Sequence, residues 1–187
     1  MNLPNKITMV RIALIPVVMI FLSPVYSFMP AWYNNFITGP GRYFGVVIFL
    51  LAAITDFLDG YLARKHNMVT KLGKFLDPIA DKLLVIAVLI ILVDKNVLSH
   101  WIAMIIIARE IIVMGIRIVA ASEGKVIAAS VIAKIKTIFQ ISAITAFLIT
   151  DIINLGILAD VLMGIAVVIT LISGFDYVKK NIHIIKQ

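Results

Sequence analysis

The sequence predicts an all-α integral membrane protein with six transmembrane helices and both termini on the cytoplasmic side. Three observations support this fold class. The chain of 187 residues is 62% hydrophobic and only 14% charged, with a mean hydropathy of +1.09, whereas a soluble domain is about half apolar and a quarter charged. Six stretches have the length and composition that cross a bilayer, about 20 mostly apolar residues each. The basic residues are also distributed asymmetrically between the ends of these stretches.

The six stretches follow one another with short connections, so we expect a single helical membrane domain over residues 1–187. The first stretch has an early basic residue and an apolar run but lacks a small-residue cleavage site. We therefore interpret it as a retained span and not as a signal peptide. The predicted spans are Ile7–Phe28, Arg42–Leu62, Phe75–Val93, His100–Ala121, Val126–Ile149 and Ile157–Val178.

The orientation follows from the basic residues, which favour the cytoplasmic side of a membrane. With a cytoplasmic amino terminus, only Arg42 and Lys95 of the 17 lysines and arginines fall on the outer side. An odd number of spans would remove this bias. We therefore expect a multi-pass protein of the cytoplasmic membrane whose active site faces the cytoplasm.

The overall charge and the absence of cysteine limit the partners further. The chain carries a net charge of +7 and has no cysteine, so disulfides and thiolate metal sites are excluded. In a chain this apolar, the positive charge favours the bilayer surface or an anionic substrate over nucleic acid as a partner.

Four aspartates lie close together on the second and third spans. Asp56 and Asp59 are three residues apart and share a helix face, and so do Asp77 and Asp81, which are four apart. A short basic turn joins the two spans, so the carboxylates can converge near the cytoplasmic surface. One aspartate at the centre of a span costs about 2.5–3.5 kcal/mol, and like charges repel. Divalent cations prefer carboxylate oxygens, so we predict a two-metal site, which suits phosphoryl transfer.

Small residues accompany the aspartates at helical spacing. Gly60, Ala63 and Gly73 would let a ligand or a neighbouring helix approach closely. Pro78 removes a backbone donor, which predicts a kink or a helix start. An alternative interpretation treats each aspartate as an ordinary interfacial residue, but it accounts for neither the pairing nor the small residues.

The stretch from residue 56 to residue 81 resembles the CDP-alcohol phosphatidyltransferase family, whose pattern is D-x2-D-G-x2-A-R-x8-G-x3-D-x3-D. Every spacing of the pattern is met, and the six-span architecture agrees with it. The matching residues are Asp56, Asp59, Gly60, Ala63, Arg64, Gly73, Asp77 and Asp81.

This resemblance implies a role for each of these residues. The first three aspartates look like ligands of two ions, Mg²⁺ or Mn²⁺, and Asp81 looks like a ligand, the general base, or both. The small residues would make room for the cytidine nucleotide, and Arg64 would face its phosphates. Thr8 would also lie near those phosphates, although it can equally be a helix-capping residue. The resemblance further implies a homodimer.

Charged residues inside the fourth and fifth spans predict a second binding site, because such residues are functional suspects. Four cations with one anion among them suggest a pocket for a phosphate monoester. Two alternatives stay open: the lysines can extend to the interface along their aliphatic stems, and Glu110 can form a purely structural pair with Arg109. The residues are Arg109, Glu110 and Arg117 in the fourth span and Lys134, Lys136 and Gln140 in the fifth.

The segments "ARE…R" and "K-x-K-T-x-x-Q", with the amino-terminal "LPNKITMVRI", resemble the members of this family that make phosphatidylglycerol phosphate. The donor implied is CDP-diacylglycerol, and the acceptor is sn-glycerol 3-phosphate. Its phosphate would be bound by Arg109, Arg117, Lys134 and Lys136. Serine does not need so basic a pocket. The basic pocket does not exclude inositol phosphate or phosphatidylglycerol as the acceptor. Only the resemblance of these segments excludes them.

Two interpretations that assign the protein to a different functional class have less support from the sequence. A divalent-cation transporter would use intramembrane carboxylates, but its pathway would reach the outer half of the membrane, which is nearly free of charge here. A structural membrane protein would give no reason for the fixed spacing of the aspartate pattern.

Overall fold

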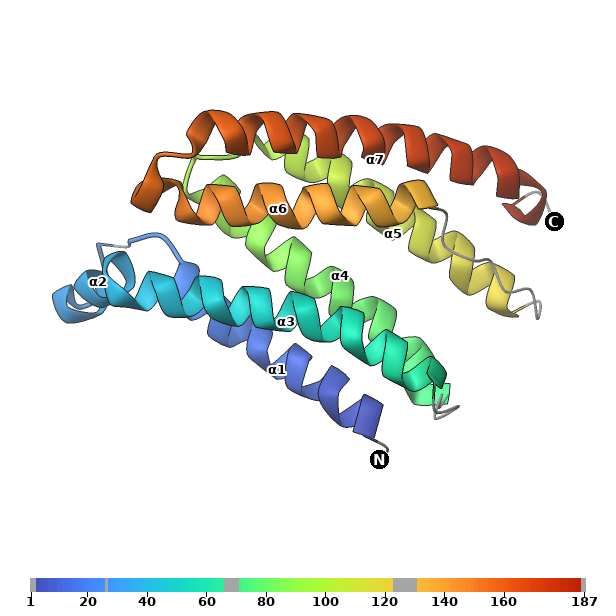
Figure 1. The fold of residues 1–187 in the computed structure, drawn as a ribbon, viewed down its shortest axis with the longest axis horizontal. Coiled ribbons are helices and arrows are strands. Elements are labelled where there is room, and N and C mark those ends of the chain that lie inside the picture. Colours follow the sequence, from blue (N-terminus) through green and yellow to red (C-terminus); the bar gives the residue numbers. More distant parts are fainter. Residues whose placement is uncertain (1–2, 26, 66–70, 123–130, 186–187) are drawn as a thin grey trace. The chain divides into compact units, whose positions relative to one another are not determined.

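The computed structural model describes residues 3–25, 27–65, 71–122 and 131–185 (Figure 1). These residues form seven helices and contain no strand, which confirms the all-helical prediction. The chain divides into two compact units, Met1–Val97 and Leu98–Gln187. The helices are α1 (Leu3–Leu22), α2 (Ala31–Thr38), α3 (Pro40–Lys65), α4 (Lys71–Asp94), α5 (His100–Ser122), α6 (Val131–Ile153) and α7 (Gly156–Ile185).

In the first unit, α1 packs against both α3 and α4. Its buried residues recur at alternating intervals of three and four, which places them on one helix face. The carboxy-terminal part of this face is apolar, but the amino-terminal part is polar and equally well buried. The residues of this face are Thr8, Arg11, Ile15, Val18 and Leu22.

A glycine of α3 allows α1 to approach closely. A Cβ atom at Gly45 would lie 2.6 Å from Cδ2 of Leu22 and 2.9 Å from Cβ of Phe21. Any larger residue would therefore push the two helices apart. Phe49 and Ala52, further along α3, are buried.

The second helix that α1 contacts, α4, presents an apolar face. Its buried residues include Ala80, Leu84, Ala87 and Ile91, at intervals of three and four. α3 and α4 also contact each other. The first unit is therefore a helix bundle in which α1 lies against both helices that carry the predicted metal ligands.

The predicted first span was too long, and a short helix was not predicted. α1 ends at Leu22 and not at Phe28, because Pro24, two residues further along the chain, has no backbone N–H. α2 then forms after Pro30, and it makes an angle of 56° with the first part of α3. Pro40 begins α3, a position that proline favours because its missing N–H would have no partner there.

Two other boundaries bear on the sequence predictions. α4 begins at Lys71, so Pro78 lies inside this helix and the alternative of a helix start there is wrong. The predicted start of the fifth span at Val126 lies outside the described residues. The structure describes α6 from Val131.

In the second unit, α7 packs against both α5 and α6. Its buried face again follows intervals of three and four. The face is apolar near the start of the helix and polar further along. Its residues are Ala159, Met163, Ala166, Thr170, Ser173 and Tyr177.

Two described helical segments are long and apolar enough to cross a membrane, Ile132–Thr150 of α6 and Gly156–Asn181 of α7. A third is present if α2 and α3 up to Thr55 count as one bent span. The apolar part of α1, Thr8–Leu22, is shorter than a typical span. The described chain thus has the apolar helices of a membrane protein.

Candidate functional site

The predicted metal ligands lie on two neighbouring helices of the first unit. Asp56 and Asp59 belong to α3, and Asp77 and Asp81 belong to α4. The two helices contact each other, and both pack on α1. The side chains of these four residues lie outside the described part of the structure, so their convergence stays a prediction.

The residues predicted to bind the CDP-lipid also belong to the first unit. Gly60, Ala63 and Arg64 are on α3, and Gly73 is on α4, with side-chain surroundings outside the described part. Thr8 is described and is only 2% exposed on the buried face of α1. Its burial beside α3 and α4 places it in the same helix bundle as the aspartate pattern.

Sequence reasoning treated Arg11 only as a basic residue of the cytoplasmic side. It is only 2% exposed and lies three positions after Thr8 on the same face of α1. A charged residue so deeply buried is rare unless it has a role or a partner. The sequence signal for the burial of Arg11 was its three-residue interval to Thr8. The apolar residues that continue this pattern along α1 strengthened the signal.

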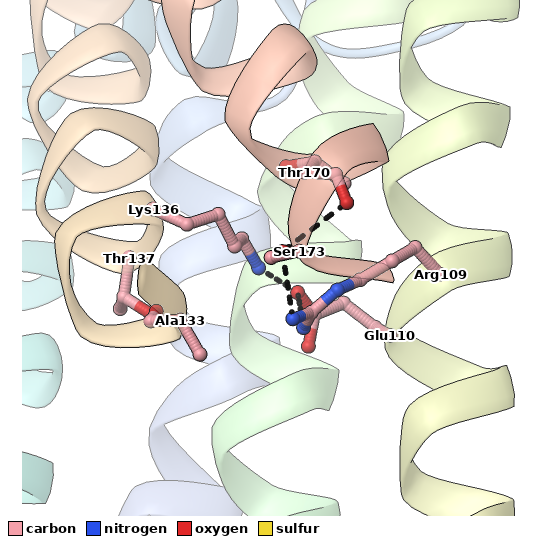
Figure 2. A network of polar contacts seen from close by, with 7 residues as sticks. All are labelled: Arg109, Glu110, Ala133, Lys136, Thr137, Thr170 and Ser173. Carbon is pink, nitrogen blue, oxygen red and sulfur yellow. Dashed lines mark hydrogen bonds and ion pairs between the residues drawn. The ribbon is translucent and has the colours of Figure 1, made fainter. Parts of the chain in front are cut away.

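The second unit contains a buried network of charged side chains. Glu110 lies on the buried face of α5 and is 3% exposed. Lys136 of α6 is 2% exposed, and its Nζ forms an ion pair with Oε1 of Glu110. Arg109 Nη1 lies 3.5 Å from the same oxygen. Figure 2 shows both cationic side chains reaching Glu110 from α6 and α5.

α7 completes this network from its own buried face. Arg109 Nη2 donates a hydrogen bond of 3.0 Å to Oγ of Ser173. Ser173 Oγ in turn donates to the backbone oxygen of Thr170 at 3.2 Å (Figure 2). We call the group of Arg109, Glu110, Lys136 and Ser173 the buried polar network. It joins all three helices of the second unit.

The buried polar network has two cationic groups and one carboxylate. Removing charges from water is costly, and burial is tolerated when opposite charges and hydrogen bonds compensate. Arg109 also has a buried Nε with no partner among the described residues, so the network could donate to an anionic group.

Further buried polar atoms belong to the same three helices. Each has no hydrogen-bond partner among the described residues, although buried polar atoms are nearly always paired in folded proteins. They can therefore supply hydrogen bonds to a polar ligand. The atoms are Arg109 Nε, Gln140 Oε1, Thr170 Oγ1 and Tyr177 OH.

The four predicted acceptor-binding residues do not share one environment. Arg109 and Lys136 belong to the buried polar network, whereas Arg117 and Lys134 are exposed. Arg117 interacts electrostatically with Tyr177, as Arg109 does. The proposal that lysine extends to the interface is wrong for Lys136, which is buried against Glu110. The ion pair between Glu110 and Arg109 is present.

Sequence reasoning missed the contribution of α7. Ser173 and Thr170 were not singled out, because isolated hydroxyl residues are common in apolar helices. The available signal was their spacing with Tyr177, at intervals of three and four. This spacing places all three on one face among apolar positions.

Residues 1–172 match the family model of the CDP-alcohol phosphatidyltransferases. Relatives named CDP-diacylglycerol–glycerol-3-phosphate 3-phosphatidyltransferase include one of Bacillus subtilis, 43% identical over 99% of this chain and 97% of the relative. One of Rickettsia bellii is 39% identical over 95% and 94%, and one of Yersinia pestis (strain Pestoides F) is 37% identical over 95% and 93%. The chain therefore belongs to the CDP-alcohol phosphatidyltransferase family.

Proposed function

We propose that this protein transfers the phosphatidyl group of CDP-diacylglycerol to sn-glycerol 3-phosphate, which yields phosphatidylglycerol phosphate and CMP. The observation that carries the proposal is the similarity over almost the whole chain to relatives named for this reaction, at 37 to 43% identity. The complete aspartate pattern from Asp56 to Asp81 supports the same chemistry.

The donor set fits a centre of two divalent ions, Mg²⁺ or Mn²⁺. Four carboxylates offer the oxygen ligands that such ions prefer, and they belong to two helices in contact. On α3, the buried residues Phe49 and Ala52 are three positions apart, and positions 56 and 59 follow Ala52 at intervals of four and three. On α4, position 77 lies three residues before the buried Ala80. The proposed ligand positions thus continue the packed faces of both helices.

The chain's own residues would then perform the transfer. Asp56, Asp59, Asp77 and Asp81 would hold the ions, which when bound neutralise charge on the pyrophosphate and on departing CMP. Asp81 would accept the proton of the acceptor hydroxyl. The oxygen of that hydroxyl forms a bond to the phosphorus that carries the diacylglycerol, and the bond from this phosphorus to the CMP oxygen breaks.

The donor would be bound by the other residues of the pattern. Gly60, Ala63 and Gly73 would leave room for the cytidine nucleotide, and Arg64 would face its phosphates. Thr8 would contribute a hydroxyl near the same phosphates, and its burial between α1 and the helices of the pattern supports this role.

The acceptor phosphate would be bound in the second unit by Arg109 and Lys136, with Arg117 and Lys134 at exposed positions. The two cationic side chains of the buried polar network and the buried Nε of Arg109 support binding of an anion. The buried Oε1 of Gln140, which has no partner among the described residues, supports binding of a ligand with hydroxyl groups. Arginine suits this task because its planar guanidinium matches phosphate geometry.

For the membrane arrangement we propose six spans with both termini in the cytoplasm and the active site on the cytoplasmic side of the cell membrane. The apolar helices and the asymmetry of the basic residues support this topology. A homodimer stays a prediction. A single membrane domain over residues 1–187 agrees with a family match that runs through both compact units.

The test is CMP release from CDP-diacylglycerol by the detergent-purified protein with Mg²⁺ or Mn²⁺. Glycerol 3-phosphate, serine, inositol phosphate and phosphatidylglycerol are offered separately. We expect release only with glycerol 3-phosphate, and we expect a chelator to abolish it. Release with a different acceptor would overturn the assigned acceptor and keep the family chemistry. Release that persists with chelator would overturn the metal centre.

A further inference from the structure

Two consecutive residues of α7 fix the position of Arg109. Ser173 accepts a hydrogen bond of 3.0 Å from Nη2 at the tip of the arginine side chain. At the other end, a Cβ atom on Gly174 would lie 2.9 Å from Cγ of Arg109, closer than real Cβ contacts come. Only glycine at position 174 leaves the arginine stem where it is. α7 therefore determines both the path of the side chain and the place of its guanidinium.

The hydroxyl of Ser173 is itself oriented. Its Oγ donates to the backbone oxygen of Thr170, at 3.2 Å, so its proton is directed back along α7. An oxygen lone pair is thereby left for Arg109. Ser173 is 3% exposed, so water does not readily replace it as the acceptor.

The guanidinium is consequently held on two sides, and its Nε–H is a further donor of the five that arginine carries. Nη2 is bonded to Ser173, and Nη1 lies 3.5 Å from Glu110. Nε is buried and has no partner among the described residues. A guanidinium fixed through its two terminal nitrogens presents its other N–H donors in defined directions, and pre-organised donors bind an anion with less loss of conformational freedom.

We infer that Ser173 and Gly174 are positioning residues for the acceptor: they hold Arg109 in the orientation in which it binds the phosphate of glycerol 3-phosphate. This inference rests on the proposed function. Both residues lie just beyond residues 1–172, which match the family model, and no residue of α7 belongs to the predicted site. They act through Arg109 and do not take part in the reaction themselves.

The test is steady-state kinetics of Ser173→Ala and Ser173→Thr in detergent, with both substrates varied. Loss of a hydrogen bond to a charged group corresponds to roughly a tenfold loss of binding. We expect Ser173→Ala to raise the KM for glycerol 3-phosphate by about this factor and to leave the KM for CDP-diacylglycerol unchanged. Ser173→Thr keeps the hydroxyl and should lie closer to the wild type. The matched control is Thr145→Ala, which removes a hydroxyl of α6 that bonds the backbone oxygen of Ile141.

Gly174→Ala tests the same inference without removing a hydrogen-bonding group. The added methyl group meets Arg109 Cγ, so the arginine must move, and the KM for glycerol 3-phosphate should rise as in Ser173→Ala. The matched control is Gly164→Ala on the same helix, where a Cβ atom meets nothing within 4 Å. Its kinetic constants should match those of the wild type.

A readout that does not depend on turnover complements the kinetics. The melting temperature of each purified variant is measured with and without glycerol 3-phosphate. The wild type, Thr145→Ala and Gly164→Ala should gain stability with the ligand, and Gly174→Ala should gain less. If Ser173→Ala does not fold, Gly174→Ala and Ser173→Thr still decide the question.

The inference is overturned if Gly174→Ala or Ser173→Ala keeps the acceptor KM of its control, or if the donor KM rises by the same factor. Failure of the proposed function looks different, because the wild-type protein would then release no CMP with glycerol 3-phosphate.

Discussion

The two compact units follow the same packing rule but build their polar sites in different ways. In each unit one helix packs against two others: α1 against α3 and α4, and α7 against α5 and α6. The buried face of each central helix is apolar over one part and polar over the other, with Thr8 and Arg11 in α1 and Thr170 and Ser173 in α7.

The units differ in how the polar and charged residues of their candidate sites are distributed along the sequence. In the first unit, four carboxylates lie within the short stretch from Asp56 to Asp81. In the second unit, Glu110, Lys136 and Ser173 come from three separate helices and meet only in the folded chain. Residue spacing in the sequence can predict a site formed by two consecutive helices. A site shared by three helices can be recognised only when the fold is known.

The largest expected effect follows from replacing a predicted metal ligand of the first unit. Asp56→Asn or Asp59→Asn should abolish CMP release, because a neutral amide is a poor ligand for a divalent cation. The melting temperature in detergent should stay close to that of the wild type, since an unoccupied cluster of carboxylates gains from losing one charge. Asp176→Asn, at a partly exposed position of α7, is the control and should remain active. Turnover by either aspartate variant would contradict the metal assignment.

The second unit is tested through Glu110→Ala, which leaves Lys136 and Arg109 buried without their carboxylate. Breaking a buried ion pair by removing one partner costs about 3–5 kcal/mol of unfolding free energy. The control is Asp176→Ala, which removes the exposed ion pair of 2.8 Å with Lys180 and should cost less than about 1 kcal/mol. Unfolding in detergent followed by circular dichroism measures both. Equal losses would mean that the buried polar network contributes no more than a surface pair.

The smallest expected effect concerns helix packing in the first unit. Gly45→Ala places a methyl group against Leu22 and Phe21, and such overpacking costs about 1–3 kcal/mol. The control is Gly115→Ala in α5, where a Cβ atom meets nothing within 4 Å and alanine favours a helix by up to about 1 kcal/mol. The two substitutions should shift the melting temperature in opposite directions. A shift of the same sign would show that α1 and α3 are less closely packed than described.

The sequence predicts the long helices well, because each is an extended apolar run. The predicted span His100–Ala121 is almost the whole of α5. The failures are local: α2 has only eight residues, too few for a periodic pattern, and its start depends on Pro30. The end of α1 at Leu22 is determined by Pro24. A hydropathy value averaged over many residues does not detect a single proline.

The candidate site shows the same division. Fixed spacing predicts the aspartate site, and charge inside a span predicts roles for Arg109 and Lys136. Spacing could not show that Lys136 faces Glu110, because residues 26 positions apart on two helices have no fixed register. Serine is also common in apolar helices, so nothing marked Ser173 as the acceptor of a hydrogen bond from Arg109.

The length of α7 has a consequence for where the second unit's site lies in the bilayer. At about 1.5 Å per residue, the helix from Gly156 to Ser173 is about 26 Å long, and the hydrocarbon layer of a membrane is about 30 Å thick. If α7 enters this layer at Gly156, Ser173 lies about 4 Å from the opposite boundary. The guanidinium bonded to Ser173 would then lie near this boundary of the hydrocarbon layer. A water-soluble phosphate could reach it from the aqueous phase without crossing the acyl chains, while the lipid donor stays in its own leaflet.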